Sequence, residues 1–208
     1  MNAENKQEKL YRSQSHKELV ENYRLWAKDY DQELRDDCHY SAPQKVVKRL
    51  SQFVAKDAKI LDAGAGTGLV GEILFEKGYF NVEGMDISAE MLEQARKKNV
   101  YTALHQKVMG EPLGFPSDSF AAIVSVGVFT YGHAPSCSFD ELIRIALPGG
   151  YILFTLRLDF YENSDFKQKL AALEQSKKWK SIDIGEPFSP LSIAKPNGYY
   201  RLWIYQVT

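Results

Sequence analysis

Residues Ile60–Gly68 read ILDAGAGTG, in which an apolar run and an aspartate lead into three glycines at alternate positions. The run Lys59–Asp62 predicts a short buried strand, and Gly68–Lys77 predicts the helix that follows it. Glycines let the backbone take positive φ angles and approach a ligand closely, while the first turn of the helix offers free N–H donors. We therefore expect a ligand-binding loop over residues 63–68.

Beyond this loop, predicted strands and helices alternate along the chain. Further strands are expected at 82–85, 101–104, 120–126 and 151–156, and helices at 16–34, from near Pro43, and at 89–98, 138–146 and 166–178. The alternation predicts an α/β fold with a mostly parallel sheet and helices on both faces. The last two β segments, 179–188 and 199–207, have no helix between them and predict a C-terminal antiparallel hairpin.

Length and composition predict the domain organisation. The chain has 208 residues, of which 44% are hydrophobic and 25% charged, as in an ordinary globular domain. We expect a flexible N-terminus at 1–14 and a single domain over 15–208, present as a cytosolic monomer. The longest apolar stretch, Phe120–Phe129, is too short to span a bilayer, and Met1–Gln14 lacks the apolar core of a secretory signal. A membrane is therefore not an expected partner.

Charge and cysteine content argue against two other classes of partner. The formal net charge is −1, and the short basic runs at 96–98 and 177–178 are typical of solvated helix faces, so nucleic acid is not an expected partner. Cys38 and Cys137 lie far apart in the chain and form no metal-binding pair, so no metal site is expected.

The glycines can be read in two registers. Gly66–Gly71 is a literal G-x-G-x-x-G, the dinucleotide pattern, which leaves a nicotinamide-dependent oxidoreductase as an alternative function. The register from Asp62 to Gly68 instead places an acid before three glycines. A carboxylate there would repel a pyrophosphate but attract an ammonium group, which favours the second register. A long helical segment before the strand and the lack of room for a separate substrate domain favour it too.

A second acid supports a bound nucleoside. Asp86 ends the second predicted strand, and a carboxylate at that place can accept both hydroxyls of a ribose. This feature would serve either cofactor. The alternative role for Asp86 is a turn or capping acid before Ser88.

Several segments together resemble the class I S-adenosylmethionine-dependent methyltransferases, over about residues 20–157: ILDAGAGTG at 60–68, GMDISAEML at 84–92, FPSDSF at 115–120 and PGG at 148–150. More closely, the chain is similar to the methyltransferase-like 27 proteins in WAKDYD at 26–31, YSAP at 40–43, GEPL at 110–113 and VGV at 126–128. The resemblance implies a Rossmann-like fold with a seven-stranded sheet. It also implies S-adenosylmethionine as cofactor, with S-adenosylhomocysteine as the product, but no particular methyl acceptor.

The resemblance also implies which residues bind the cofactor. Those expected near its methionine moiety are Asp62, Gly64, Ala65 and Gly66. Those expected at the ribose and adenine are Asp86, Ile87, Met91, Met109 and Gly110. Those expected at the methyl-transfer mouth, or covering the cofactor, are Val126, Gly127, Trp26 and Tyr30. Ordinary core packing is an equal alternative for Trp26 and Tyr30.

The chain departs from the family pattern after the third predicted strand. Many members carry an acid there that meets the adenine amine, whereas this chain has Met109 and Gly110. We expect that amine to meet backbone or water instead.

The expected reaction is in-line displacement at the sulfonium methyl. Alignment of the acceptor can contribute roughly 7–11 kcal/mol, and a general base is needed only if the acceptor must lose a proton. The candidates are His133 and Tyr131, in the loop after the fourth predicted strand, although the sequence favours an exposed loop position for His133. Arg157 is expected either to meet an anionic acceptor or to form a surface ion pair.

The segment Ser125–Val128 reads SVGV and lacks the Asn/Asp-Pro-Pro-Tyr tetrad that marks methylation of amino groups on nucleic-acid bases. We therefore expect a small-molecule acceptor, with a protein acceptor open. A non-catalytic S-adenosylmethionine-binding regulatory protein is a further alternative, because the sequence offers no clear catalytic residue.

Overall fold

The computed structural model describes residues 6, 9–13, 15–34, 39–190 and 198–208. Most of the N-terminal segment predicted to be flexible, 1–14, and Cys38 lie outside these residues. The described residues 9–13 lie against the rest of the protein, with Leu10 buried. Among the described residues, no helix combines the length and apolar composition that a membrane crossing requires.

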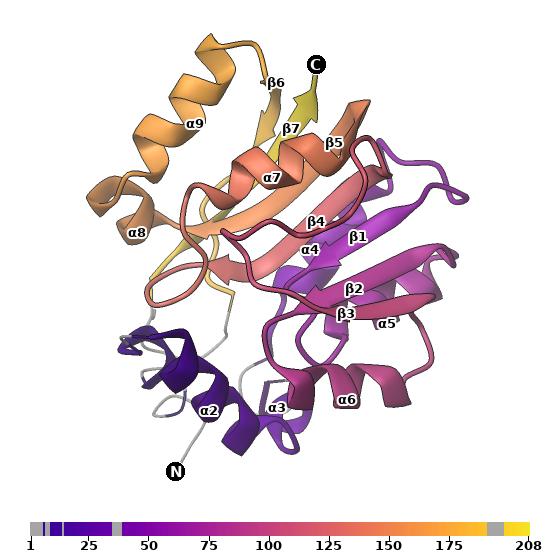
Figure 1. Ribbon diagram of the computed structural model, residues 1–208, viewed down its shortest axis with the longest axis vertical. Helices are drawn as coiled ribbons and strands as arrows, with labels where there is room; N and C mark the ends of the chain where they lie inside the picture. Colours follow the sequence, from indigo (N-terminus) through magenta and orange to yellow (C-terminus); the bar gives the residue numbers. More distant parts are fainter. Residues whose placement is uncertain (1–5, 7–8, 14, 35–38, 191–197) are drawn as a thin grey trace.

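A seven-stranded sheet forms the centre of the molecule, with the order β3-β2-β1-β4-β5-β7-β6 (Figure 1). Its strands are β1 (Ile60–Ala63), β2 (Val82–Asp86), β3 (Ala103–Gln106), β4 (Phe120–Phe129), β5 (Ala146–Arg157), β6 (Trp179–Ile184) and β7 (Tyr200–Val207). The first five strands pair in parallel, and β7 runs antiparallel between β5 and β6. The predicted mostly parallel sheet with a C-terminal antiparallel pair is therefore confirmed.

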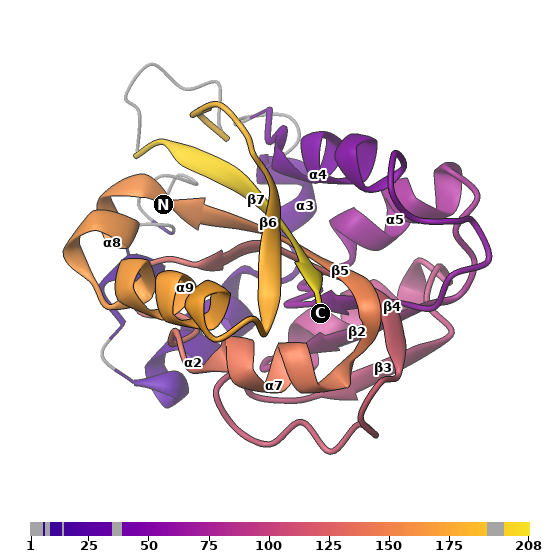
Figure 2. The same ribbon diagram turned by 90° about the horizontal axis from the view of Figure 1, so that it is seen from above.

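Helices cover both faces of the sheet, as Figure 2 shows for α4 and α5 on one side and α7 and α9 on the other. The described helices are α2 (His16–Trp26), α3 (Tyr30–Gln32), α4 (Ala42–Leu50), α5 (Leu69–Glu76), α6 (Ala89–Lys97), α7 (Ser138–Ile145), α8 (Leu158–Asn163) and α9 (Phe166–Gln175). Apolar side chains of α4 and α5 pack on β1, β2 and β4, and those of α7 and α9 pack on β4 and β5. The central strands β1 and β4 are mostly buried between these layers because both faces are covered there.

The single helix predicted over 16–34 is wrong, because the structure ends α2 at Trp26 and begins α3 at Tyr30. The break turns the Tyr30 ring onto the Trp26 ring, with 4.7 Å between their centroids. It also lets Nε1 of Trp26 donate to Glu33 at 2.6 Å. These contacts connect residues on the two sides of the turn.

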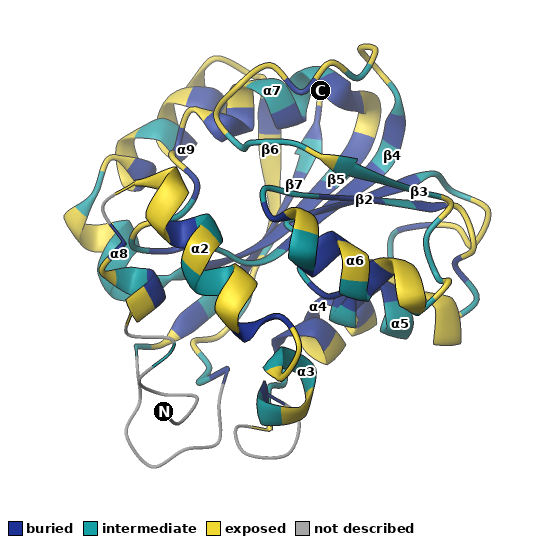
Figure 3. Cartoon of the chain, turned by 60° about the horizontal axis from the view of Figure 1, so that its bottom comes forward, coloured by how far each residue is buried: buried dark blue, intermediate teal, exposed yellow. Residues whose placement is uncertain are grey.

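Helix α2 lies across the end of the sheet at which the parallel strands finish (Figure 1). Its outer side is exposed, whereas Leu19 and Trp26 are buried on its inner side (Figure 3). The spacing of these apolar residues gives the helix one inward face. As a result, α2 covers the loops that follow β1, β2 and β4.

Candidate functional site

A cavity lies between α2 and the carboxyl ends of β1, β2 and β4, with about 1260 Å³ of empty space, part of it open to solvent. The strand order places β1 between β2 and β4, which is the point where the chain reverses its direction across the sheet. Ligands of open α/β sheets bind at this kind of crevice. The cavity is therefore the candidate site.

The glycine loop forms one wall of the cavity. Gly64 has a φ of +92°, and a Cβ added there would lie 2.2 Å from Cγ2 of Val128, so only glycine fits. The amides of Gly64 and Ala65 both donate to the carbonyl of Met85 at 2.8 Å. These bonds fix the loop against the end of β2.

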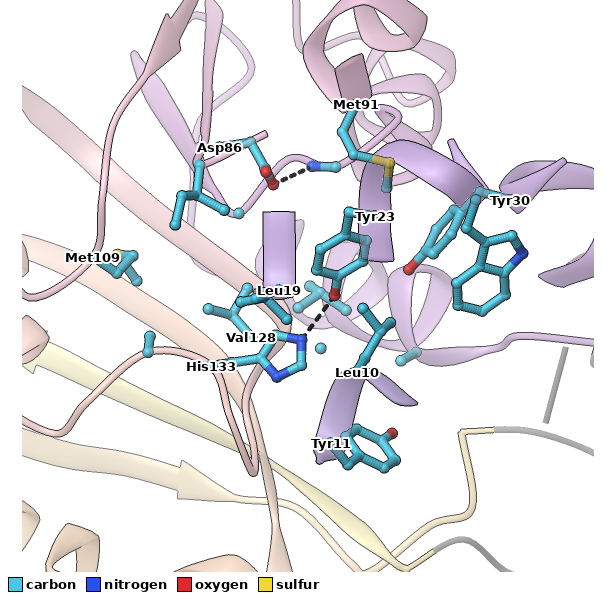
Figure 4. Close-up of a pocket in the computed structure, with 18 of the residues that line it drawn as sticks. Leu10, Tyr11, Leu19, Tyr23, Tyr30, Asp86, Met91, Met109, Val128 and His133 are labelled. Carbon is cyan, nitrogen blue, oxygen red and sulfur yellow. Dashed lines mark hydrogen bonds between the residues drawn. The ribbon is translucent and has the colours of Figure 1, made fainter. Parts of the chain in front are cut away.

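Asp86 joins the glycine loop to the start of α6. Its Oδ2 accepts from the amide of Gly66 at 2.9 Å, the bond drawn at Asp86 in Figure 4, and its Oδ1 accepts from the amide of Ser88 at 2.9 Å. Burial raises the pKa of Asp86, and the backbone hydrogen bonds from Ser88 and Gly66 oppose that rise. Asp86 also lines the cavity, so the turn-forming role is present in the structure, and binding of a ribose stays a prediction.

Asp62 lies behind the loop rather than in the cavity wall, and it is fully buried. The hydroxyl of Tyr101 donates to its Oδ2 at 2.6 Å, while its Oδ1 has no hydrogen-bond partner among the described residues. Burial raises the pKa of Asp62 to about 7, against the lowering effect of the Tyr101 hydrogen bond. The carboxyl group of Asp62 therefore titrates near neutral pH.

Most of the residues expected at the cofactor line this cavity: Trp26, Tyr30, Gly64, Gly66, Asp86, Ile87, Met91, Met109, Val126 and Gly127. Asp62, Ala65 and Gly110 do not line it. Gly110 packs instead against Pro135, whose Cγ lies 2.6 Å from where a Cβ would stand. After β3, the cavity is lined by Lys107, Val108 and Met109.

His133 lies in the cavity wall, in the loop after β4. Its Nε2 is 2.8 Å from the hydroxyl of Tyr23 (Figure 4), and its Nδ1 is 2.7 Å from the backbone carbonyl of Tyr131. Burial lowers the pKa of His133 to about 4, so the ring is neutral at pH 7. The interpretation of His133 as an exposed loop residue is therefore wrong.

The side chains of Tyr131 and Arg157 lie outside the cavity lining. The Tyr131 ring packs on Phe160, with 4.8 Å between centroids, so only its backbone carbonyl reaches His133. Arg157 forms an ion pair with Asp159 at 2.7 Å and lies over the ring of Tyr11 at 5.0 Å. Of the two roles expected for Arg157, the structure contains the ion pair.

Comparison with known proteins identifies the family. A family model described as a methyltransferase domain matches residues 61–154. The chain is also 36% identical, over 168 residues, to methyltransferase-like protein 27 of Homo sapiens, covering 77% of this chain and 67% of that protein. The chain belongs to the class I S-adenosylmethionine-dependent methyltransferases. S-adenosylmethionine is accordingly its cofactor.

Other relatives of this methyltransferase are more distant. It is 29% identical over 121 residues to the 18S rRNA (guanine-N(7))-methyltransferase of Bos taurus, covering 53% of this chain and 42% of that protein. It thus spans about two thirds of the human relative and less than half of the bovine one. An S-adenosylmethionine-dependent methyltransferase from Mesorhizobium loti shares the fold, with a TM-score of 0.59 and 17% identity over 76% of this chain and 96% of that one.

The family selects the register Asp62–Gly68 over the nicotinamide alternative, and the structure gives a reason for the competing glycine. Gly71 lies within α5, where a Cβ would stand 2.3 Å from Cζ of Tyr101. The amide of Gly71 donates to the Tyr101 hydroxyl at 3.2 Å. Gly71 thus makes room for the ring of Tyr101. This packing explains the glycine that completes the G-x-G-x-x-G pattern at 66–71.

Sequence reasoning missed the tyrosines that line the rest of this methyltransferase's cavity: Tyr11, Tyr23, Tyr40 and Tyr200. The hydroxyls of Tyr11 and Tyr200 lie 3.2 Å apart, although their positions are far apart in the sequence. Burial raises the pKa of Tyr23, Tyr40 and Tyr200, so their hydroxyls are neutral. Tyr40 stands in the YSAP segment at 40–43 and Tyr23 lies within the helix predicted over 16–34, but neither pattern marked a cavity residue.

Proposed function

We propose that this methyltransferase binds S-adenosylmethionine along the glycine-loop side of the cavity and methylates a small molecule held on the tyrosine-lined side. The cavity itself supports this proposal most strongly. It lies beneath α2, and Lys107 is the only lysine or arginine among its described lining residues. A site for an RNA backbone would instead present several cations to the phosphates.

The residues around the loop fit the cofactor. Oδ1 of Asp62 is buried behind the loop without a partner among the described residues, and its negative charge would attract the ammonium group of the methionine moiety across the loop. Asp86 presents a carboxyl group, fixed by two backbone amides, to the ribose. Ile87 and Met91 supply apolar walls suited to a flat adenine ring.

The cofactor supplies a methyl group that is already activated by the positive charge on sulfur. The protein would therefore act mainly by holding the acceptor in line and keeping water out. Alignment of this kind can lower a barrier by roughly 7–11 kcal/mol. Val126 and Gly127, which lie on β4 and line the cavity, would border the point of transfer. A monomeric state and a cytosolic location stay predictions from the sequence.

Calorimetry with S-adenosylmethionine and S-adenosylhomocysteine tests the proposed cofactor site. Asp86→Ala should weaken both affinities at least about tenfold, because it removes the proposed ribose acceptor and a partner of the loop amide. Asp140→Ala is the matched control, since Asp140 is exposed and paired with Lys169 on the surface. Equal affinities in the wild type and Asp86→Ala would exclude this placement of the ribose.

Incubation with labelled cofactor tests the acceptor class. Label should pass to compounds in a low-molecular-weight metabolite extract. Because one relative is named an 18S rRNA methyltransferase, total RNA and a protein extract serve as the competing acceptors. Transfer to either of these, with none to small molecules, would overturn the small-molecule assignment.

A further inference from the structure

The hydrogen bond between Tyr23 and His133 has a defined direction. A backbone carbonyl can only accept, so the 2.7 Å contact between Nδ1 of His133 and the Tyr131 carbonyl places the ring hydrogen on Nδ1. Because the ring is neutral, Nε2 then carries a lone pair. The hydroxyl of Tyr23, 2.8 Å away, must therefore donate its hydrogen to Nε2.

This direction leaves the Tyr23 oxygen free to accept a hydrogen bond. Tyr23 comes from α2 and His133 from the loop after β4, and the two side chains point toward each other across the cavity (Figure 4). Both belong to the same lining as Gly127, at the proposed point of methyl transfer. A hydroxyl group in the cavity that donated to Tyr23 would thus be joined through Tyr23 to the His133 lone pair.

Aromatic groups face the pair from several elements. Tyr11 meets the His133 ring edge to face, with 6.3 Å between centroids, and Tyr30 lies 6.3 Å from the Tyr23 ring. Burial raises the pKa of the Tyr23 phenol most, and the Asp86 carboxylate raises it further. The same negative charge would repel an anionic acceptor, and the aromatic walls suit a flat ring.

We propose that Tyr23 and His133 form a proton relay for an uncharged acceptor that carries an aromatic hydroxyl group. This inference rests on the proposed methyl transfer. The acceptor oxygen attacks the methyl carbon, the new C–O bond forms, and the C–S bond breaks with its electron pair left on sulfur. The acceptor proton passes to the oxygen of Tyr23 while the Tyr23 proton passes to Nε2 of His133. The resulting imidazolium returns the proton to water through Tyr23.

A weakly basic histidine is sufficient for this role. A phenolic oxygen becomes strongly acidic as it bonds to the methyl carbon, so its proton needs an acceptor late in the reaction rather than a strong base at the start. The low pKa of His133, about 4, then favours release of the proton after the transfer.

Nitrogen-15 NMR of the histidine rings tests the relay without turnover. In the ligand-free protein, His133 should show a protonated Nδ1 and a bare Nε2 from pH 6 to 8. With S-adenosylhomocysteine present, 4-methylphenol should shift the Nε2 resonance, whereas 4-methylanisole, which lacks the hydroxyl hydrogen, and the anionic 4-hydroxybenzoate should not. A protonated Nε2 in the free protein, or equal shifts with 4-methylphenol and 4-methylanisole, would overturn the relay.

Kinetics with a panel of uncharged phenols, 4-methylphenol among them, give the second test. Tyr23→Phe removes the bridging hydroxyl, and His133→Gln keeps an acceptor for Tyr23 but cannot take up its proton. Each variant should lower kcat about 100-fold with little change in KM. Tyr79→Phe is the matched control, because Tyr79 donates to the carbonyl of Val54 at 3.0 Å and does not line the cavity.

The outcomes separate the relay from the function on which it rests. Loss of S-adenosylhomocysteine binding in the wild type would overturn the proposed cofactor site. Normal binding with no transfer to any phenol, or unchanged kcat in both Tyr23→Phe and His133→Gln, would overturn the relay alone. A purely structural role would lower the melting temperature of these variants and leave kcat close to the wild-type value.

Discussion

The hydroxyl of Tyr101 donates a 2.6 Å hydrogen bond to Oδ2 of Asp62 and accepts one from the amide of Gly71 at 3.2 Å. One phenol thus links the end of β1, the helix after the glycine loop and the residues that lead into β3. Asp62 is fully buried, and a buried carboxyl group without partners is costly. The stability of the loop should therefore depend on Tyr101.

Tyr101→Phe should lower the free energy of unfolding by about 1–3 kcal/mol, since it leaves Asp62 and the Gly71 amide without this partner. The loss should be larger at pH 8 than at pH 5, because the carboxylate form of Asp62 needs the donor more. Urea titrations at the two pH values measure the difference. An equal loss at both would show that the hydroxyl does not act through Asp62.

Asp62 itself should make stability depend on pH. Burial raises the pKa of Asp62 from 3.8 to about 7, so between these values the folded state holds a proton that the unfolded state has lost. The free energy of unfolding should consequently fall as pH rises from about 4 to about 7. Asp62→Asn should remove this contribution and, in ligand-free protein at pH 8, add roughly 2–4 kcal/mol of stability.

The matched control for that measurement is Asp140→Asn, at an exposed carboxylate paired with Lys169. This variant should keep the pH dependence of the wild type. If the free energy of unfolding of Asp62→Asn still falls between pH 4 and 7, another titrating group causes the fall.

Cofactor binding should show the opposite pH dependence to stability. In the proposed site the ammonium group of the cofactor favours the ionised form of Asp62, so affinity for S-adenosylhomocysteine should rise as pH increases through about 7. Calorimetry from pH 5.5 to 8 measures this change. Asp62→Asn should remove the pH dependence of the affinity and weaken binding at pH 8. An unchanged pH dependence in this variant would show that the ammonium group does not interact with Asp62.

Gly64→Ala should destabilise the protein by about 1–3 kcal/mol, because it combines a φ of +92° with a contact of 2.2 Å to Val128. Gly149→Ala measures the backbone part alone, since Gly149 has a φ of +79° and no neighbour within 4 Å of its Cβ. Melting temperatures of the two variants should differ by the steric part. Adding Val128→Ala to Gly64→Ala should restore only the stability lost to the steric contact. Full restoration of stability would contradict a contribution from the backbone conformation.

Asp31 should control how firmly the α2–α3 segment holds the glycine loop. It accepts from the hydroxyl of Thr67, in the loop, and forms an ion pair with Lys98 at 2.5 Å. Asp31→Ala should therefore speed the dissociation of S-adenosylhomocysteine several-fold and raise amide exchange across α2. Stopped-flow release measures the first effect. Glu21→Ala, which removes an exposed pair with Arg24, should leave both rates unchanged.

Much of the fold could be predicted because it depends on local pattern. The apolar strands, the glycine loop and the acid at Asp86 follow from residue types at short spacings, and the sheet has the predicted parallel and antiparallel parts. The break after Trp26 could not be predicted, since the apolar periodicity of a helix continues through the turn between α2 and α3.

The site was predictable on one side only. Residues of the glycine loop and of β2 belong to a contiguous motif, whereas Tyr11, Tyr40 and Tyr200 meet from segments that are distant in the sequence. Tyr101 was predicted as a strand residue, but it precedes β3 and turns its hydroxyl to Asp62. Contacts between residues that are distant in the sequence depend on the tertiary structure, and the patterns of a single sequence do not indicate them.

The placement of α2 over the cavity divides the protein's chemistry between two parts of its chain. The groups proposed to hold the cofactor come largely from the sheet and its loops, whereas Tyr11 and Tyr23 on the acceptor side come from the segment before the sheet. Changes in that leading segment should therefore alter the selectivity for the acceptor while the proposed cofactor contacts stay intact. Grafting residues 9–34 from a relative should transfer part of that selectivity, because Tyr40, His133 and Tyr200 reach the cavity from other segments.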